Sequence, residues 1–148
     1  MAKLHSKKLL DDSKTNDKMI VRHLQSLGKR CKTVDGLADK KGKYDIVIWS
    51  EKLGTMRIDT KYTNRPESRL FYEIAKHENS DANFIWYFLN CQNMTSFLVK
   101  KDALKKLVAG RHRYQARENG DLLTDFSINE LKANADYWKI DMSKSFVY

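Results

Sequence analysis

The chain has 148 residues, a length that suits one domain with a single sizeable core. A hydrophobic content of 41% with three tryptophans argues against disorder, and no apolar run approaches the roughly 18 residues of a membrane span. Lys and Arg total 28 against 19 Asp and Glu, and this formal charge of +9 favours a polyanionic partner, most often nucleic acid. The alternative is a surface that is merely basic and soluble.

The N-terminal stretch MAKLHSKKLL carries charge but no apolar segment of a signal peptide, so a cytoplasmic protein is expected. Residues 1–12 are expected to form a flexible basic arm. Cys31 and Cys91 lack the spacing of a metal site or a disulfide framework, which favours reduced thiols. No linker or repeat divides the chain, so residues 1–148 are predicted to form a single domain.

The first predicted element is a helix over residues 14–28. Its residues Ile20, Leu24 and Leu27 recur at helical spacing on one face, and Gly28 is a suitable C-terminal stop. This spacing predicts an amphipathic helix.

Strands are predicted next. A short strand over residues 31–35 precedes two longer ones, YDIVIWS at 44–50 and TMRIDTKYT at 55–63, which a short turn joins into a hairpin. Pro66 suits a first helical turn, so a helix is predicted over 66–80.

The second half of the chain alternates between apolar strands and short helices. NFIWYFLN is apolar on both faces, which is typical of a central strand. SINE has the form of a capping box at a helix start. The predicted segments are a strand at 83–90, a strand at 95–99, a helix at 101–110, a helix start at 127–130, and YWKIDM, which is either a last strand or irregular. This order indicates an α/β fold with a mixed central β-sheet flanked by helices.

Two of the apolar strands each carry an aspartate, Asp45 and Asp59, although an unpaired buried charge is costly. Because side chains alternate along a strand, Asp59 and Lys61 share a face, and Asp45 can approach that face from the neighbouring strand. Asp17 lies on the apolar face of the first helix. Two interpretations stay open: Asp17 joins the site with a partner or metal, or it sits in the first turn and only favours the helix dipole.

Carboxylates beside a lysine can hold Mg²⁺, activate a water and neutralise charge on a phosphodiester. The acid-x-Lys pattern occurs four times, but only Asp59-Thr60-Lys61 lies on a predicted strand. The alternative is a surface ion pair, either Asp59–Lys61 or Asp45–Arg57.

The chain resembles the PD-(D/E)xK nuclease superfamily over about residues 14–100. The resemblance lies in the order of a helix, the strand YDIVI, a hairpin turn, the strand RIDTK and a second helix. The resemblance implies a restriction-endonuclease-like αβββαβ core. The chain departs from the family pattern in two places: Tyr44 replaces the motif proline, and the first-helix acid is Asp17 rather than Glu.

The resemblance also implies roles for individual residues. Asp45 and Asp59 would be catalytic metal ligands, Lys61 the catalytic lysine, and the carbonyl of Thr60 a further ligand, with Asp17 mapping to the helix acid. The expected cofactor is Mg²⁺, for which Mn²⁺ should substitute.

Other residues are candidates for auxiliary roles. Glu73 and His77 lie four residues apart on a predicted helix, so they share a face of it. Either this pair has a metal-binding or general-base role, or the face is simply exposed to solvent. Five arginines near the site or in the segment RHRYQAR are predicted to bind nucleic acid, unless that segment is only a basic loop: Arg65, Arg69, Arg111, Arg113 and Arg117.

These features predict a Mg²⁺-dependent DNA endonuclease. It is expected to be site-specific, of the homing or restriction kind, and its small size is typical of enzymes from phages or mobile elements. A homodimer or homotetramer would cut both strands of a duplex. The alternatives are a Holliday-junction-type resolvase, an RNA-processing nuclease, and a catalytically silent nucleic-acid-binding module on the same fold.

Overall fold

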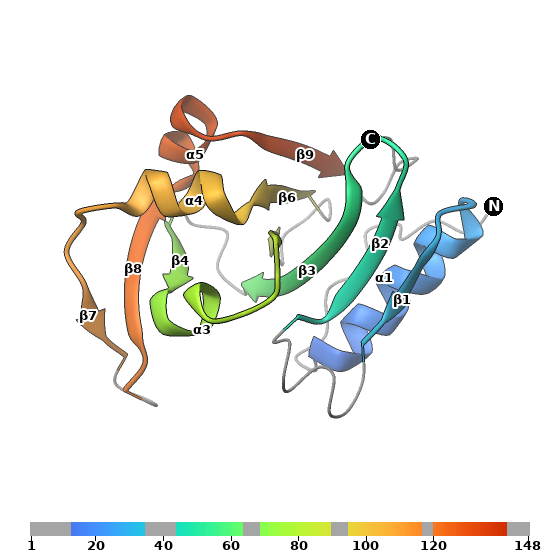
Figure 1. Cartoon of the computed structure of the whole chain (residues 1–148), viewed down its shortest axis with the longest axis horizontal. Coiled ribbons are helices and arrows are strands. Elements are labelled where there is room, and N and C mark those ends of the chain that lie inside the picture. The colour runs from blue at the N-terminus through green and yellow to red at the C-terminus, as the bar shows by residue number, and fades with distance from the viewer. Residues whose placement is uncertain (1–12, 35–43, 64–68, 90–94, 117–119, 142–148) are drawn as a thin grey trace.

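The computed structural model describes residues 13–34, 44–63, 69–89, 95–116 and 120–141 (Figure 1). The arm predicted for residues 1–12 lies outside them. The described residues form a mixed α/β fold, as predicted, built on a six-stranded sheet of order β1-β2-β3-β5-β6-β9. Its strands are β1 (Cys31–Thr33), β2 (Ile46–Ser50), β3 (Gly54–Thr63), β5 (Phe84–Leu89), β6 (Thr95–Lys100) and β9 (Tyr137–Asp141).

The sheet combines antiparallel and parallel pairs. β2 and β3 form the predicted antiparallel hairpin, in which Ile46 pairs with Ile58. β3 and β5 run parallel, with Asp59 opposite Ile85. A parallel pair needs a crossover between its strands, and the chain between β3 and β5 supplies it. All six residues of β5 are buried, which confirms the prediction of a central strand.

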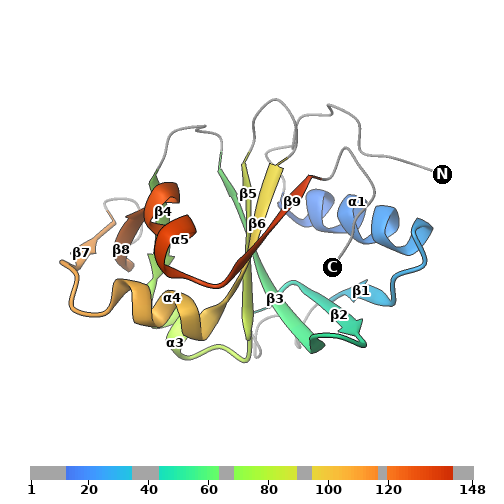
Figure 2. The same cartoon turned by 90° about the horizontal axis from the view of Figure 1, so that it is seen from above.

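Four helices and a smaller sheet flank this sheet in the described part of the chain. Figure 2 shows α1 on one side and the small sheet with α3, α4 and α5 on the other. The small sheet has the order β4-β8-β7. These elements are α1 (Ser13–Ser26), α3 (Ile74–Glu78), α4 (Lys101–Val108), α5 (Ile128–Asn134), β4 (Arg69–Glu73), β7 (Tyr114–Gln115) and β8 (Leu122–Ser127). None of the described helices has the length and apolar content needed to cross a membrane.

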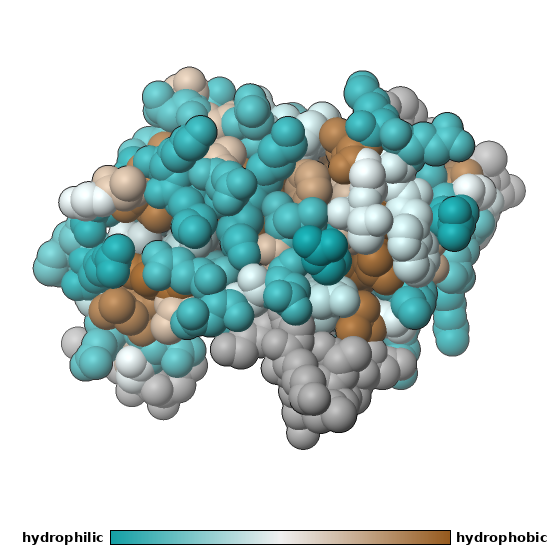
Figure 3. Space-filling view, viewed as in Figure 1, coloured by the Kyte–Doolittle hydropathy of each residue, from teal (hydrophilic) through white to brown (hydrophobic). Residues whose placement is uncertain are grey.

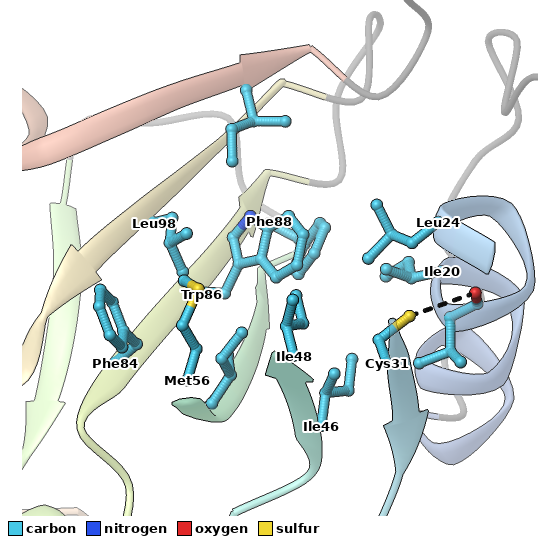
Figure 4. Close-up of a cluster of buried hydrophobic side chains, with 13 residues drawn as sticks. Ile20, Leu24, Cys31, Ile46, Ile48, Met56, Phe84, Trp86, Phe88 and Leu98 are labelled. Atoms are coloured by element: carbon cyan, nitrogen blue, oxygen red, sulfur yellow. Dashed lines mark hydrogen bonds between the residues drawn. The ribbon is translucent and has the colours of Figure 1, made fainter. Parts of the chain in front are cut away.

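Each face of the large sheet has its own hydrophobic core. On one face, Ile20 and Leu24 of α1 pack in a cluster with Ile46, Ile48 and Trp86 (Figure 4). This contact explains the predicted apolar stripe of the first helix. Because α1 covers this face, the even-numbered side chains of β2 and β3 point into the cluster and the odd-numbered ones point away from it.

The second core joins the other face to the small sheet. Ile85 of β5 packs there with Leu104 of α4, Phe126 of β8 and Leu131 of α5. The capping box predicted at the start of α5 is present, because the Ser127 side chain accepts a hydrogen bond from the Glu130 amide and the Glu130 side chain accepts one from the Ser127 amide. Of the two alternatives for YWKIDM, the strand is present, because Tyr137–Asp141 form β9.

The helix predicted over residues 66–80 is wrong in most of its described part. Residues 69–73 form β4, and only Ile74–Glu78 is helical. Along β4, Leu70 and Tyr72 are buried and Arg69 and Phe71 are exposed, a period of two. This alternation lets β4 pair with β8, a strand that was not predicted from the sequence. Tertiary pairing therefore overrides the helix-start signal of Pro66, which lies outside the described residues.

Candidate active site

Asp59 and Lys61 lie side by side on one face of β3, as strand alternation predicts. Lys61 Nζ is 3.2 Å from Asp59 Oδ2. The Asp59 side chain is only 1% exposed, so its charge needs compensation from the protein. Among the described acid-x-Lys matches, this is the one that lies on a strand.

Two further groups from α3 stabilise the Asp59 carboxylate. His77 Nε2 lies 2.7 Å from Oδ2, and Lys76 Nζ lies 3.8 Å from Oδ1. Burial alone would raise the pKa of Asp59, but the His77 hydrogen bond and the charges of Lys61 and Lys76 outweigh it and hold this pKa well below its usual range. Asp59 is therefore ionised at neutral pH.

His77 is fully buried and acts as a neutral donor. Burial lowers the pKa of its imidazole more than the hydrogen bond and charge of Asp59 raise it. The neutral ring then carries its proton on Nε2 and donates it to the Asp59 carboxylate. This fixes the orientation of Asp59 from a second element, α3.

Asp45 lies at the edge of β3, immediately before β2. Its Oδ2 accepts hydrogen bonds from the Thr60 amide at 2.9 Å and from the Thr60 hydroxyl at 3.1 Å. Burial raises the pKa of Asp45 to about 7, and the negative charge of nearby Asp59 adds to this effect. Two acids that approach so closely favour a shared proton or a bound cation.

Asp17 reaches the same strand from the opposite face. Its Oδ1 lies 2.8 Å from the Thr60 hydroxyl and 2.6 Å from the Tyr62 hydroxyl. Burial raises the pKa of Asp17, and these hydrogen bonds offset that effect only in part. The helix-dipole interpretation is wrong, because α1 begins at Ser13 and has no acid in its first turn.

The donor set fits a hard divalent cation. Asp45 accepts the Thr60 hydrogen bonds and Asp59 the His77 hydrogen bond on Oδ2, whereas Oδ1 of Asp45 lies 3.9 Å from Lys14 Nζ and Oδ1 of Asp59 lies 3.8 Å from Lys76 Nζ. A residue in a strand turns its N–H and C=O to the same edge, so the Thr60 carbonyl faces the edge where its amide meets Asp45. Two carboxylate oxygens and one carbonyl suit Mg²⁺, which keeps several waters.

The same edge has no complete cage of protein ligands. Across the described residues, no group of three or more His, Cys, Asp or Glu side chains has the arrangement of a metal-binding cluster. Waters and a substrate oxygen would therefore have to complete the coordination of any ion held between Asp45 and Asp59. A cation bound in this way keeps positions open for chemistry.

Glu73 enters the site through Lys61. It forms an ion pair with Lys61 Nζ from the end of β4, and a pocket of about 180 Å³ opens beside this pair. Burial would lower the pKa of Lys61, but the charges of Asp59 and Glu73 raise it overall, so Lys61 stays an ammonium. The prediction that Glu73 and His77 share one helix face is wrong because Glu73 precedes α3. Nevertheless, both residues contact the Asp59–Lys61 pair.

The five arginines predicted to bind nucleic acid do not form one described cluster. Arg69 pairs with Asp125 and, at 3.8 Å, with Glu130, and Arg111 also pairs with Glu130, so acids on the small sheet and α5 offset both charges. Arg113 is exposed before β7. Contact of these three with nucleic acid stays a prediction, and the other two, Arg65 and Arg117, lie outside the described residues.

No protein-family model matches the chain, and no curated protein matches it in sequence. Function is therefore inferred from the site itself. This site consists of two aspartates beside an ammonium on a central strand, with a buried neutral histidine behind one aspartate and a hydroxyl-bound third aspartate on the opposite face.

Proposed function

We propose that the protein is a Mg²⁺-dependent DNA endonuclease of the PD-(D/E)xK type. One observation carries the proposal: Asp59 and Lys61 contact each other on β3, and Asp45 lies at the adjacent strand edge, where its Oδ2 accepts a hydrogen bond from the Thr60 amide. Acids alone would repel DNA, and the formal charge of +9 provides the attraction that the site lacks.

Each residue has a role that follows from its environment. Asp45, Asp59 and the Thr60 carbonyl would hold the ion, which when bound lowers the pKa of a water and stabilises charge on the phosphate. Asp45 has to release its proton to become a ligand, because its pKa is raised to about 7. His77 keeps Asp59 oriented toward the ion through its hydrogen bond to the other carboxylate oxygen.

Lys61 acts as a cation rather than as a base. Its raised pKa keeps the ammonium protonated at neutral pH, so it cannot accept a proton from water. It can instead donate to a phosphate oxygen as negative charge develops there in the transition state. Glu73 forms an ion pair with the Lys61 ammonium, and this pair keeps Lys61 next to Asp59.

The proposal is tested by incubating the protein with supercoiled plasmid, a four-way DNA junction and single-stranded RNA, each with Mg²⁺ and with EDTA. Mg²⁺-dependent nicking or linearisation of DNA supports it, and selective cutting of the junction would identify the resolvase alternative. Binding without cleavage in Mg²⁺ would identify a silent binding module. Sedimentation of the same samples tests the proposed homodimer or homotetramer.

A further inference from the structure

An exposed aromatic side chain lies beside two cations at the far end of β2. Trp49 is 37% exposed. Arg30 Cζ is 5.4 Å from the centre of the Trp49 ring, and Lys32 Nζ is 5.9 Å from it. Both cations lie within cation–π range, so the indole holds two otherwise mobile positive groups in place.

This group faces the same side of the sheet as the candidate active site. Lys32 pairs with Val47, and Val47 pairs with Arg57, so these three side chains share a face. Trp49 lies two residues after Val47, and Asp59 lies two residues after Arg57, so strand alternation places both on that face as well. In Figure 3, paler and brown atoms gather over β2 and β3 within a face that is otherwise mostly hydrophilic.

The distance between the two places is set by the strand register. Trp49 pairs with Thr55, which is four residues from Asp59 along β3. At about 3.3 Å per residue this is roughly 13 Å. A duplex advances about 3.4 Å per base pair, so the same length covers about four base pairs.

The chemistry of the group suits a phosphate backbone. Arg30 and Lys32 lie beside the indole, and the N–H groups of a guanidinium and an ammonium donate strong, charge-assisted hydrogen bonds to phosphate oxygens. A pocket of about 360 Å³ beside Trp49 is lined by Arg30 and Lys52 among others, with Glu51 as the acid in the lining. The positive charge exceeds the negative charge there.

We propose that Arg30, Lys32 and Trp49 form a phosphate clamp that binds the nucleic-acid backbone about four base pairs from the cleaved bond. The proposal rests on the nucleic-acid substrate of the proposed function. Arg30 and Lys32 bind phosphates, and Trp49 positions them. The clamp makes binding depend on duplex that extends beyond the cleavage position toward the far end of β2.

The test measures binding of a labelled 30-base-pair duplex by fluorescence anisotropy in Ca²⁺ across a range of salt concentrations. The double variant Arg30→Gln/Lys32→Gln should bind about tenfold or more weakly. The slope of the logarithm of the binding constant against the logarithm of salt concentration should become less negative by roughly 1.8, because each lost phosphate contact removes about 0.9. The matched control Lys105→Gln/Lys106→Gln removes two exposed charges from α4 and should leave the slope unchanged. Trp49→Ala should weaken binding less than the double variant, and thermal melting checks that each variant is folded.

Equal slopes for the double variant and the control would overturn the clamp. Single-turnover cleavage in Mg²⁺ separates this result from the fate of the proposed function. Wild-type cleavage with unaltered binding in the clamp variants rejects the clamp alone. Clamp-dependent binding without any wild-type cleavage rejects the nuclease alone and supports the clamp, and absence of binding rejects both.

Discussion

Asp45 and Asp59 lie beside each other at the edge between β2 and β3, and they titrate in opposite directions. Burial and the charge of Asp59 raise the pKa of Asp45 to about 7, while His77 and two lysines overcome the effect of burial and hold the pKa of Asp59 well below its usual range. One acid is therefore ready to bind a cation, and the other has to exchange a proton for it.

This pair predicts how stability depends on pH in the absence of metal. Asp45 loses its proton near pH 4 in the unfolded chain but only near pH 7 in the folded protein. Between these values the folded state binds more protons, so its free energy of unfolding should fall as pH rises from about 4 to 7. Asp45→Asn should therefore raise the melting temperature at pH 8 and change it little at pH 4.

Differential scanning calorimetry in EDTA checks this prediction, with the exposed Asp81→Asn as control. Saturating Mg²⁺ should stabilise the wild-type protein at pH 8 and stabilise Asp45→Asn less. If Asp45→Asn exceeds the wild-type melting temperature no more at pH 8 than at pH 4, the charge of Asp45 does not destabilise the folded protein.

His77 is predicted to position Asp59 for the metal. His77→Ala should weaken Mg²⁺ binding about 10- to 100-fold, a typical loss when the partner behind a metal ligand is removed. His77→Gln keeps a donor and should recover part of the affinity. Isothermal titration of Mg²⁺ measures this, and His112→Ala, which changes an exposed histidine, is the control. If His77→Ala and His77→Gln have the same affinity for Mg²⁺ as each other, the hydrogen bond from His77 to Asp59 has no role in the site.

Thr60 is predicted to connect the two faces of β3. Its hydroxyl lies between Asp17 and Asp45, at 2.8 Å and 3.1 Å. Thr60→Val removes this hydroxyl but keeps the shape and the backbone carbonyl, so it should cost about 1–3 kcal/mol of stability by leaving buried acids short of a donor. Thr60→Ser should cost less. Urea unfolding compares them, and equal losses would assign the cost to packing instead.

The sequence predicts the parts of the site that depend on local periodicity. Alternation along β3 is enough to place Asp59 and Lys61 together, and helical spacing is enough to put Asp17 on the buried side of α1. The hairpin also follows from sequence, because two apolar runs flank a short turn that ends at Gly54, whose φ of 77° suits glycine.

The missing parts depend on contacts between distant segments. Nothing in the segment RLFYE distinguishes a strand from a helix until β8 is available to pair with it. His77 reaches Asp59 because α3 follows β4 directly along the chain. The four-residue spacing of Glu73 and His77 identifies two residues of the site, but the two do not share a helix face, because Glu73 precedes α3. Lys14, a lysine of another acid-x-Lys match, lies 3.9 Å from Asp45, a proximity that its sequence context does not indicate.

Single-turnover cleavage tests the central claim most directly. Lys61→Ala and Asp45→Asn should each lower the rate about a hundredfold or more in Mg²⁺, since each removes a group that acts on the transition state or holds the ion. Binding of the same duplex in Ca²⁺ should persist in both variants. Lys132→Ala, which changes an exposed lysine of another acid-x-Lys match on α5, should cut at the wild-type rate. If Lys61→Ala and Asp45→Asn cut as fast as Lys132→Ala, the Asp45–Asp59–Lys61 cluster is not the active site.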